Sequence, residues 1–312
     1  MSPAVEHAAS GFAPVAKSWA ASSRLPFLSV GIMPYLLGAA VASSDGSFTS
    51  VPVFWLGLAC VVLIMLTTYL NGEYADIVED QVSADLGRNP FAGGGGPVVE
   101  GALSRRAVRI GGYVTAGLAV VIGLVLAFVF KTGALTIPLG VFGLIAGYFY
   151  SMPPFRWVER GFGEVLIGIC YGWLPVAVGY YLQAGALPPV LFWVSLPIAF
   201  TIFNVIFVNE YPDWEGDTAA GKANLLVRIG RERGVWVYAA AVIAAPIAYV
   251  FAVAYGVPAA LWPWYAGVVA VSIVPMVMLF AGKWRERKML VPICALTIVV
   301  NLATSAILIA SY

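Results

Sequence analysis

The stretch LACVVLIMLTTYLNGEYADIVED, residues 58–80, joins an apolar run directly to an acidic cluster. A second stretch, FTIFNVIFVNEYPDWEGD, residues 200–217, does the same. When Gly72 is left out, the two acidic ends read NEYADIVED and NEYPDWEGD, with Glu, Tyr, Asp and Asp in the same order. A run of about 20 apolar residues is long enough to cross a bilayer. Each stretch therefore predicts a membrane-spanning helix that ends in carboxylates.

The composition of the whole chain indicates an integral membrane protein. The 312 residues are 61% hydrophobic and 11% charged, against roughly 25% charged residues in a soluble domain, and the mean hydropathy is +0.89. A net charge of +1 gives no indication of a nucleic-acid partner. Three scattered cysteines and one histidine, His7, exclude a disulfide framework and a histidine metal site. We expect the lipid bilayer to surround the chain, and we expect no partner nucleic acid.

Apolar runs recur along the chain, and each predicts a membrane helix. The prediction is an all-α protein with nine spans, at roughly 25–43, 52–71, 110–130, 133–151, 163–183, 189–209, 234–255, 258–281 and 290–310. Asp76 and Asp213 are 137 residues apart, and so are Asp80 and Asp217. The aspartates of the first motif follow the second predicted span, and those of the second motif follow the sixth. Both spans are even-numbered, so both motifs reach the same face of the membrane. We interpret the chain as two related, pseudo-repeated halves.

Basic residues predict the orientation. With the N-terminus in the cytoplasm, every Lys and Arg except Lys131 falls on the inner side, as the positive-inside rule requires. We therefore predict a multi-pass protein of the cell (inner) membrane with its active site on the cytoplasmic side. Residues 1–20 are expected to be a polar N-terminal tail, and residues 21–312 a single transmembrane domain. Two cytoplasmic cap loops are expected at about 72–109 and 209–233.

The acidic residues are spaced as ligands for a hard metal ion. Helix positions i, i+3 and i+7 share a face, so a continuous helix would line up three carboxylates in each motif. Carboxylates without His or Cys favour Mg²⁺ or Ca²⁺, and Mg²⁺ in proteins commonly binds substrate phosphates as well. We predict a Mg²⁺–diphosphate site with Asp76, Asp80, Asp213 and Asp217 as catalytic residues and metal ligands, and Glu73 and Glu210 as further ligands. The alternative is a solvated acidic helix end, which is our interpretation for Glu79 and Glu215.

Basic residues near the motifs are candidates for binding phosphate oxygens. Lys222 and Arg228 follow the second motif, and Arg88 follows the first; each could pair with a diphosphate. The alternative role is anchoring at the inner leaflet, which we favour for Arg105, Arg106 and residues 283–288. The run GGGG at 93–96 lacks the Lys-Ser/Thr ending of a P-loop. We interpret this run as a flexible lid.

These motifs resemble the UbiA superfamily of intramembrane aromatic prenyltransferases. The family's first motif, N-D-x-x-D-x-x-x-D, corresponds to GEYADIVED at 72–80. Here Gly72 stands in the place of the Asn, Glu73 replaces the first Asp, and Asn71 lies one residue early. The second motif, D-x-x-x-D, is intact as DWEGD at 213–217, with Asn209 ahead of it. The following AAGKANLLVRIG at 219–230 is similar to a basic stretch of the family.

Within the superfamily, the block YSMPPFRWVERGFGEVLIGICYGWLPVAVGYYLQAG at 150–185 looks most like that of 1,4-dihydroxy-2-naphthoate prenyltransferases. The resemblance implies nine helices around a central cavity and Mg²⁺-dependent transfer of a polyprenyl group from polyprenyl diphosphate to an aromatic acceptor, in quinone synthesis of the menaquinone type. It implies substrate-binding roles for Asn71, Arg88, Asn209, Lys222, Arg228, Tyr148 and Tyr150, the tyrosines through their ring faces.

Three alternatives stay open at this point. A related UbiA-type enzyme could use another acceptor, such as a 4-hydroxybenzoate-like ring, a chlorin or another prenyl lipid. A non-catalytic lipid-binding protein would fit the altered first motif. A secondary transporter would place its charges near the middle of the bilayer, whereas here they lie at helix ends.

Overall fold

A computed structural model of the chain describes residues 12–92 and 96–312, and every regular element within them is a helix. The glycines at 93–95 of the predicted lid, and His7 of the predicted tail, lie outside the described residues. The helices are α1 (Phe12–Ser22), η1 (Leu25–Leu28), α2 (Ser29–Ser44), α3 (Val51–Ala75), α4 (Ile77–Asp85), α5 (Arg105–Leu124), η2 (Val125–Val129), α6 (Thr136–Ser151), η3 (Trp157–Glu159), α7 (Gly163–Ile167), η4 (Gly168–Trp173), α8 (Leu174–Ala184), α9 (Val190–Ala219), α10 (Leu225–Ile229), α11 (Arg231–Ala254), α12 (Trp262–Phe280), η5 (Lys283–Arg285) and α13 (Arg287–Ala310).

The described part of the chain has eight helices long and apolar enough to cross a membrane, so the predicted count of nine was one too high by this measure. The exception is α6, which has 16 residues and is ~24 Å long, against a hydrocarbon core of ~30 Å. It begins later than predicted because Lys131 and Gly133 both have positive φ angles, which keep the preceding turn out of the helix. The chain is a multi-pass, all-helical membrane protein.

The two acidic motifs have different backbones. Helix α9 runs without interruption through the second motif to Ala219, so the segment predicted as a cap loop from residue 209 is helical over its first part. Helix α3, in contrast, ends at Ala75, and Asp76 leaves the helical region with φ −97° and ψ 32° before α4 begins. The continuous helical face predicted for the first motif is therefore wrong.

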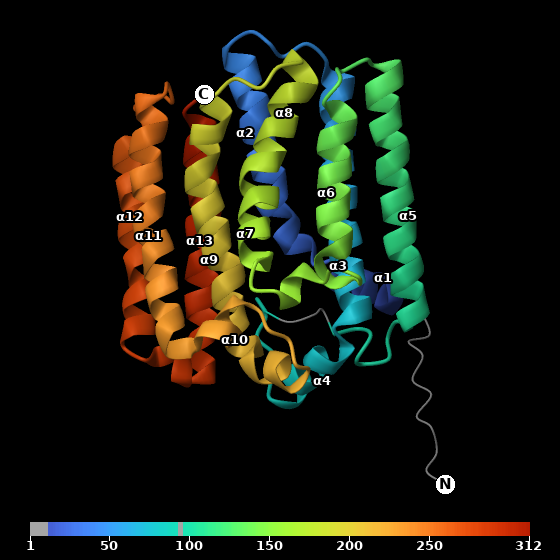
Figure 1. Ribbon diagram of the computed structural model, residues 1–312, viewed down its shortest axis with the longest axis vertical. Helices are drawn as coiled ribbons and strands as arrows, with labels where there is room; N and C mark the ends of the chain where they lie inside the picture. The colour runs from blue at the N-terminus through green and yellow to red at the C-terminus, as the bar shows by residue number, and fades with distance from the viewer. Residues whose placement is uncertain (1–11, 93–95) are drawn as a thin grey trace.

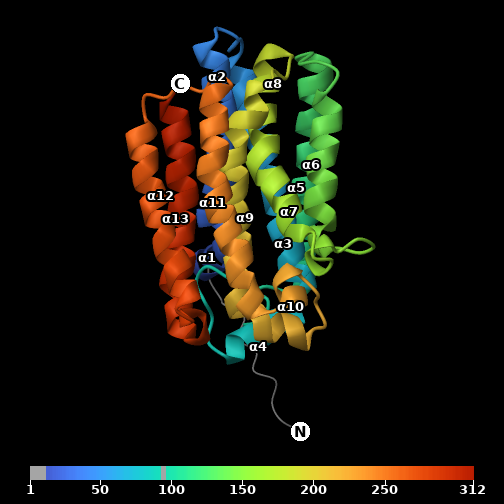
Figure 2. The same ribbon diagram turned by 60° about the vertical axis from the view of Figure 1, so that its left-hand side comes forward.

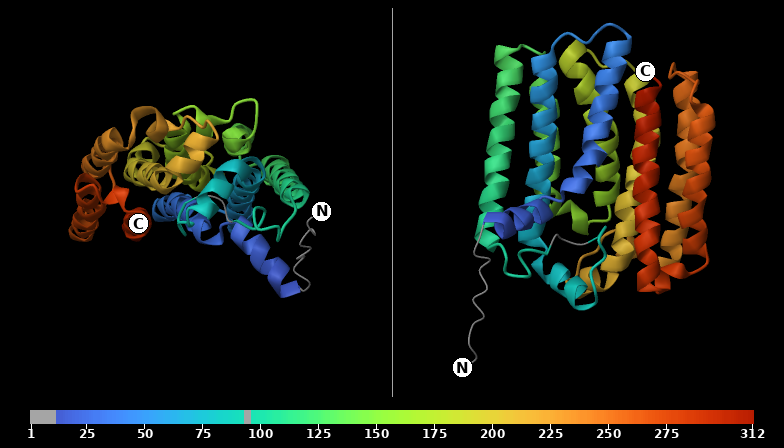
Figure 3. Two further views of the ribbon diagram at one scale, coloured as in Figure 1. Left: turned by 90° about the horizontal axis from the view of Figure 1, so that it is seen from below. Right: turned by 180° about the vertical axis from the view of Figure 1, so that it is seen from behind.

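The helices stand roughly parallel, and the two motifs reach the same end of the bundle (Figures 1 and 2). We call this the motif end; it carries α4 and α10, and the C-terminus lies at the opposite end (Figure 1). Helix α1 lies across the motif end (Figure 3), with Trp19 packed beside Leu70 and Val108. Because α1 extends from Phe12 to Ser22, it runs across the predicted boundary between tail and membrane domain at residue 20.

Small residues let α2 and α8 approach closely. A side chain at Gly38 would meet the backbone oxygen of Val176 at 2.0 Å, and one at Gly179 would meet that of Tyr35 at 2.2 Å. Close backbone contact at glycines is a common way for membrane helices to associate. The tight α2–α8 pair lies in the middle of the row of helices, whereas α5 and α6 stand at one edge of it (Figure 1).

Candidate active site

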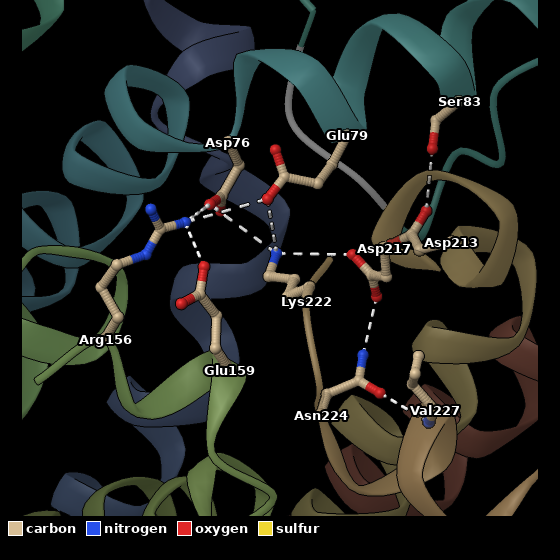
Figure 4. Close-up of polar contacts among 10 residues, drawn as sticks. All are labelled: Asp76, Glu79, Ser83, Arg156, Glu159, Asp213, Asp217, Lys222, Asn224 and Val227. Atoms are coloured by element: carbon tan, nitrogen blue, oxygen red, sulfur yellow. Dashed lines mark hydrogen bonds and ion pairs between the residues drawn. The ribbon is translucent and has the colours of Figure 1, made fainter. Parts of the chain in front are cut away.

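A cavity of about 180 Å³ lies at the motif end and is lined by both acidic motifs. The structure brings six predicted metal ligands to this one cavity: Glu73, Asp76, Asp80, Glu210, Asp213 and Asp217. Asn209 and Lys222 line it as well. The interpretation of two related halves required this meeting, since α3 and α9 deliver one motif each (Figure 4).

Lys222 joins the two motifs. Its ammonium nitrogen lies 3.4 Å from Asp217 Oδ1, 3.7 Å from Asp76 Oδ1 and 3.7 Å from Glu79 Oε1. Burial lowers the pKa of Lys222, but the three carboxylates outweigh burial and hold this pKa well above its usual range. The side chain therefore stays a cation at neutral pH, in a nearly buried position.

The carboxylates outnumber the cations. Among the described residues, seven acidic side chains line the cavity, with only Arg24 and Lys222 as basic ones. Burial raises the pKa of the Asp76 carboxyl to about 6, against the attraction of Lys222. Such an excess of buried negative charge is unfavourable without further cations.

The donor set fits Mg²⁺. It consists of carboxylate oxygens, which are the ligands of hard cations, and Asp76 Oδ1 is buried with no hydrogen-bond partner among the described residues. Within the same residues, no three acidic, His or Cys side chains already converge on one metal position. Lys222 holds a central place among these carboxylates.

Glu79 belongs to the cavity, which corrects its interpretation as a solvated helix end. It is only 7% exposed and lies 3.7 Å from Lys222 and 3.9 Å from Arg156. The break in the helix at Asp76 changes the phase of α4 and turns Glu79 inward. Glu215 does fit the earlier interpretation: its side chain is 41% exposed and pairs with Arg231 at 3.0 Å.

Asn71 lies outside the cavity, against the prediction of a substrate contact. Its Oδ1 atom faces α5, where a side chain at Gly112 would meet it at 2.9 Å. Gly72 lines the cavity in its place. One residue turns a helix by ~100°, so the register shift seen in the sequence moves the amide from the cavity to a helix–helix contact.

Two predicted basic residues also lie apart from the cavity lining. Arg88 pairs with Glu100 at 3.2 Å, and Arg228 donates to the backbone oxygens of Ala223 and Glu159. Each has a local partner, so the geometry gives neither a direct path to a bound diphosphate.

Arg24, which lines the cavity, and Arg156 are basic residues that sequence reasoning missed, because both were assigned only to the positive-inside pattern. Arg156 stands beside the acidic residues of the cavity. It lies 2.5 Å from Glu159 and 3.9 Å from both Asp76 and Glu79. Its place in the 150–185 block was the signal available in the sequence.

The turn that carries Lys222 is fixed by three acceptors. Asn224 donates to Asp217 Oδ2 at 2.7 Å and caps α10 by accepting from the Val227 amide at 2.8 Å. Glu164 accepts from the Leu225 amide at 2.7 Å, and Glu210 accepts from the Leu226 amide at 3.2 Å, which are the first two amides of α10. Acceptors at a helix N-terminus satisfy amides that have no partner within the helix. One oxygen of Glu210 therefore binds an amide of α10 and helps to fix the turn that carries Lys222.

A second, apolar chamber of about 90 Å³ adjoins the polar cavity on the side away from the motif end. The two share Thr68, Tyr150, Ile167 and Tyr171 in their walls. The predicted Tyr150 therefore stands at the junction, together with Tyr171, which was not predicted. Tyr148 lines neither space, and its ring packs against Phe149.

The sequence profile of the UbiA prenyltransferase family matches residues 30–302. The chain belongs to this family. Among UbiA-related enzymes, it is 25% identical over 238 residues to 1,4-dihydroxy-2-naphthoate octaprenyltransferase of Bacillus subtilis, covering 76% of this chain and 73% of that protein. It is 26% identical over 230 residues to 2-carboxy-1,4-naphthoquinone phytyltransferase of a Synechocystis strain, covering 73% and 71%.

The fold is also that of solved UbiA structures. A UbiA homologue from Archaeoglobus fulgidus, bound to GPP and Mg²⁺, superposes with a TM-score of 0.60 at 17% identity and covers 93% of this chain and 99% of that one. At this identity the likeness establishes the UbiA fold.

Proposed function

We propose that this chain transfers a polyprenyl group from polyprenyl diphosphate to 1,4-dihydroxy-2-naphthoate or a closely similar aromatic acid, in quinone synthesis of the menaquinone type. The observation that carries the proposal is the pair of adjoining spaces, one charged at the motif end and one apolar, which share Tyr150 and Tyr171 in their walls. A diphosphate with an isoprenoid tail has the same two parts. The naphthoate-derived acceptors of the relatives support the choice of acceptor.

The charged part would bind the diphosphate. Mg²⁺, when bound, would neutralise the diphosphate and make it a better leaving group; its ligands would come from Asp76, Asp80, Asp213 and Asp217, with Glu73 and Glu210 beside them. Lys222 donates hydrogen bonds to the phosphate oxygens, Arg24 is the other basic side chain of the cavity lining, and Arg156 adds positive charge beside Asp76 and Glu79. Asn209 contributes a buried Oδ1 with no partner among the described residues.

The junction is the proposed place of the reaction. The allylic C–O bond breaks with its electron pair leaving on the diphosphate, and Lys222 stabilises the developing charge. The ring faces of Tyr150 and Tyr171 stabilise positive charge on the allylic carbon, and the apolar chamber keeps water away from it. An electron-rich ring carbon of the acceptor then forms the new C–C bond, and loss of a proton or of the acceptor's carboxylate as CO₂ restores the aromatic ring.

We further propose that the motif end faces the cytoplasm and that the membrane is the cell (inner) membrane. The positive-inside rule supports this orientation, because Lys131 is the one basic residue that the sequence pattern places at the other side.

The test is an acceptor panel with the full-length protein in liposomes, labelled octaprenyl diphosphate and Mg²⁺. The panel contains 1,4-dihydroxy-2-naphthoate, 4-hydroxybenzoate and a chlorophyllide. We expect a prenylated naphthoate and no comparable product with the other two. Transfer to another ring would show that the proposed acceptor is wrong. Donor binding without transfer to any acceptor would indicate a non-catalytic lipid-binding protein.

A further inference from the structure

Three arginines in the first turns of α5 have no acidic partner in the described part of the chain. Arg105, Arg106 and Arg109, which we call the arginine cluster, belong to α5, and none of the ion pairs within the described residues includes them. Arg88 and Arg231, elsewhere in the chain, each pair with a glutamate. Like charges three or four residues apart on a helix repel. The arginine cluster is therefore unfavourable until an anion joins it.

Tyrosines hold the cluster in place without neutralising it. The guanidinium carbons of Arg105 and Arg109 lie 4.3 and 4.6 Å from the centre of the Tyr74 ring, and Arg109 donates to the Tyr113 hydroxyl at 2.9 Å. A guanidinium group has five N–H donors, so these contacts use only part of the supply. Arg106 is exposed and has no partner among the described residues. Donors of all three side chains remain available to an anion.

The cluster stands at the head of a surface that faces lipid. Helix α5 lies at the edge of the bundle and begins at the motif end (Figures 1 and 3). Ile110 and Tyr113 follow Arg106 on the same face of the helix and are 51% and 47% exposed. Gly117 continues this face, and a side-chain carbon built on it would meet nothing within 4 Å among the described residues. Positive charge is thus followed by an apolar strip with a hollow at Gly117.

We propose that the arginine cluster binds the phosphate of an anionic phospholipid in the leaflet at the motif end, with one acyl chain lying over Gly117. A phospholipid has the same order of parts, a charged phosphate followed by apolar chains. Guanidinium groups bind phosphate through charge-assisted, often bidentate hydrogen bonds, and basic residues beside an anionic leaflet are attracted to it. The site is narrower than general positive-inside retention because it assigns one lipid to three named side chains. It requires neither the donor nor the acceptor of prenyl transfer.

The bound lipid would also support the first acidic motif. Arg105 donates from Nε to the backbone oxygen of Tyr74 at 3.0 Å, and Tyr74 lies one residue before the end of α3 at Ala75. The last carbonyl groups of a helix have no partner within the helix, so Arg105 completes the end of α3 next to the break at Asp76. A phosphate that holds Arg105 holds this contact as well. Since a ligand of the folded state stabilises it, the lipid should raise the melting temperature.

The experiment counts the lipids that the full-length protein retains, by native mass spectrometry after titration in detergent micelles. The probes are phosphatidylglycerol, phosphatidylcholine as a lipid without net charge, and inorganic phosphate as a soluble anion. The variants are Arg106→Gln, which removes a charge and no contact of the described structure, and Gly117→Phe, which fills the hollow. The matched control is Arg285→Gln, because Arg285 is also exposed but pairs with Glu232 at 3.6 Å. Melting temperatures in phosphatidylcholine check that each variant is folded.

We expect the wild type to retain one phosphatidylglycerol in preference to phosphatidylcholine, and to melt at a higher temperature with it. Arg106→Gln should weaken this retention about fivefold, the usual effect of one basic residue at an anionic leaflet. Gly117→Phe should weaken it too, because the ring takes the place of the acyl chain, whereas Arg285→Gln should match the wild type.

Three results would overturn the lipid site. Equal retention of the two lipids by the wild type would exclude it. An equal loss in Arg106→Gln and Arg285→Gln would show attraction to surface charge in general. Displacement of phosphatidylglycerol by inorganic phosphate, with Gly117→Phe unaffected, would show a site for a soluble anion instead.

Discussion

The ammonium group of Lys222 lies 3.7 Å from the carboxylate of Asp76, so a residue that follows the second acidic motif reaches the first. Asp217, at 3.4 Å, is bound by the same nitrogen. The two motifs are thus tied together by one buried cation (Figure 4). In this arrangement a diphosphate would lie against Lys222 and against carboxylates from both halves of the chain.

Replacing Lys222 should reduce catalysis more than donor binding. Lys222→Met removes the cation that stabilises the leaving diphosphate, and we expect kcat to fall by about 10²–10³, the usual effect of losing one preorganised donor. Lys283→Met is the control, because Lys283 is exposed and pairs only with Glu286 in the described structure. Steady-state kinetics of prenyl transfer measure both variants. A kcat for Lys222→Met equal to that of the control would contradict the role.

The carboxylates should determine the need for Mg²⁺. Asp76→Asn and Asp217→Asn each remove one charge from the cavity, and we expect the Mg²⁺ concentration for half-maximal activity to rise by about 10–100-fold. Glu215→Gln is the matched control, since Glu215 pairs with Arg231 away from the cavity. Titration of activity with Mg²⁺ after chelation gives the three values. Equal Mg²⁺ requirements in all three variants would exclude a metal site at these aspartates.

Because of the register shift at Gly72, we expect a change at Asn71 to affect stability and a change at Gly72 to affect donor binding. Asn71→Ala changes a helix contact with α5 and should lower the melting temperature while leaving kcat/KM within about twofold, as expected for a residue outside the site. Gly72→Asn places an amide into the cavity, where the nearest atoms to the new carbon are 3.8 Å away, so it should fold and change KM for the donor. If Asn71→Ala alone reduces kcat/KM strongly, Asn71 is a substrate contact after all.

Asn224 should act by positioning Lys222. Asn224→Ala removes the cap of α10 and the hydrogen bond to Asp217, and loss of an N-cap costs about 1 kcal/mol of stability. Asn224→Ser restores the cap without the reach to Asp217. We expect Asn224→Ser to have the melting temperature of the wild type but a kcat between those of Asn224→Ala and the wild type. A full recovery of kcat by Ser would show that the contact with Asp217 contributes nothing.

The sequence predicted the parts of the site that depend on apolar runs and spacing. The spans that lead to the two motifs are long apolar runs, and both are even-numbered in the predicted order, so the delivery of both motifs to one end followed from length and span order. Lys222 was found because it follows the second motif closely. The short α6 was counted as a span because its apolar run includes the turn around Lys131 and Gly133, where positive φ angles delay the helix.

Other parts of the site depend on tertiary structure. Glu79 faces the cavity because α3 breaks at Asp76, and nothing in the spacing of the first motif distinguishes a broken helix from a continuous one. Arg156 reaches the cavity from the connection between α6 and α7, which a one-dimensional pattern does not place beside α4. Arg88 and Arg228 were predicted by proximity in sequence, but nearer partners bind them.

The central claim is that both motifs act on one diphosphate in a prenyl transfer. The most direct measurement follows diphosphate release and prenylated naphthoate together, for the wild type, Asp76→Asn and Asp213→Asn, with Mg²⁺ and with EDTA. We predict equal amounts of the two products from the wild type with Mg²⁺ only, and a large loss of both from either variant. Formation of the product in EDTA, or full activity after the change in either motif, would contradict the account.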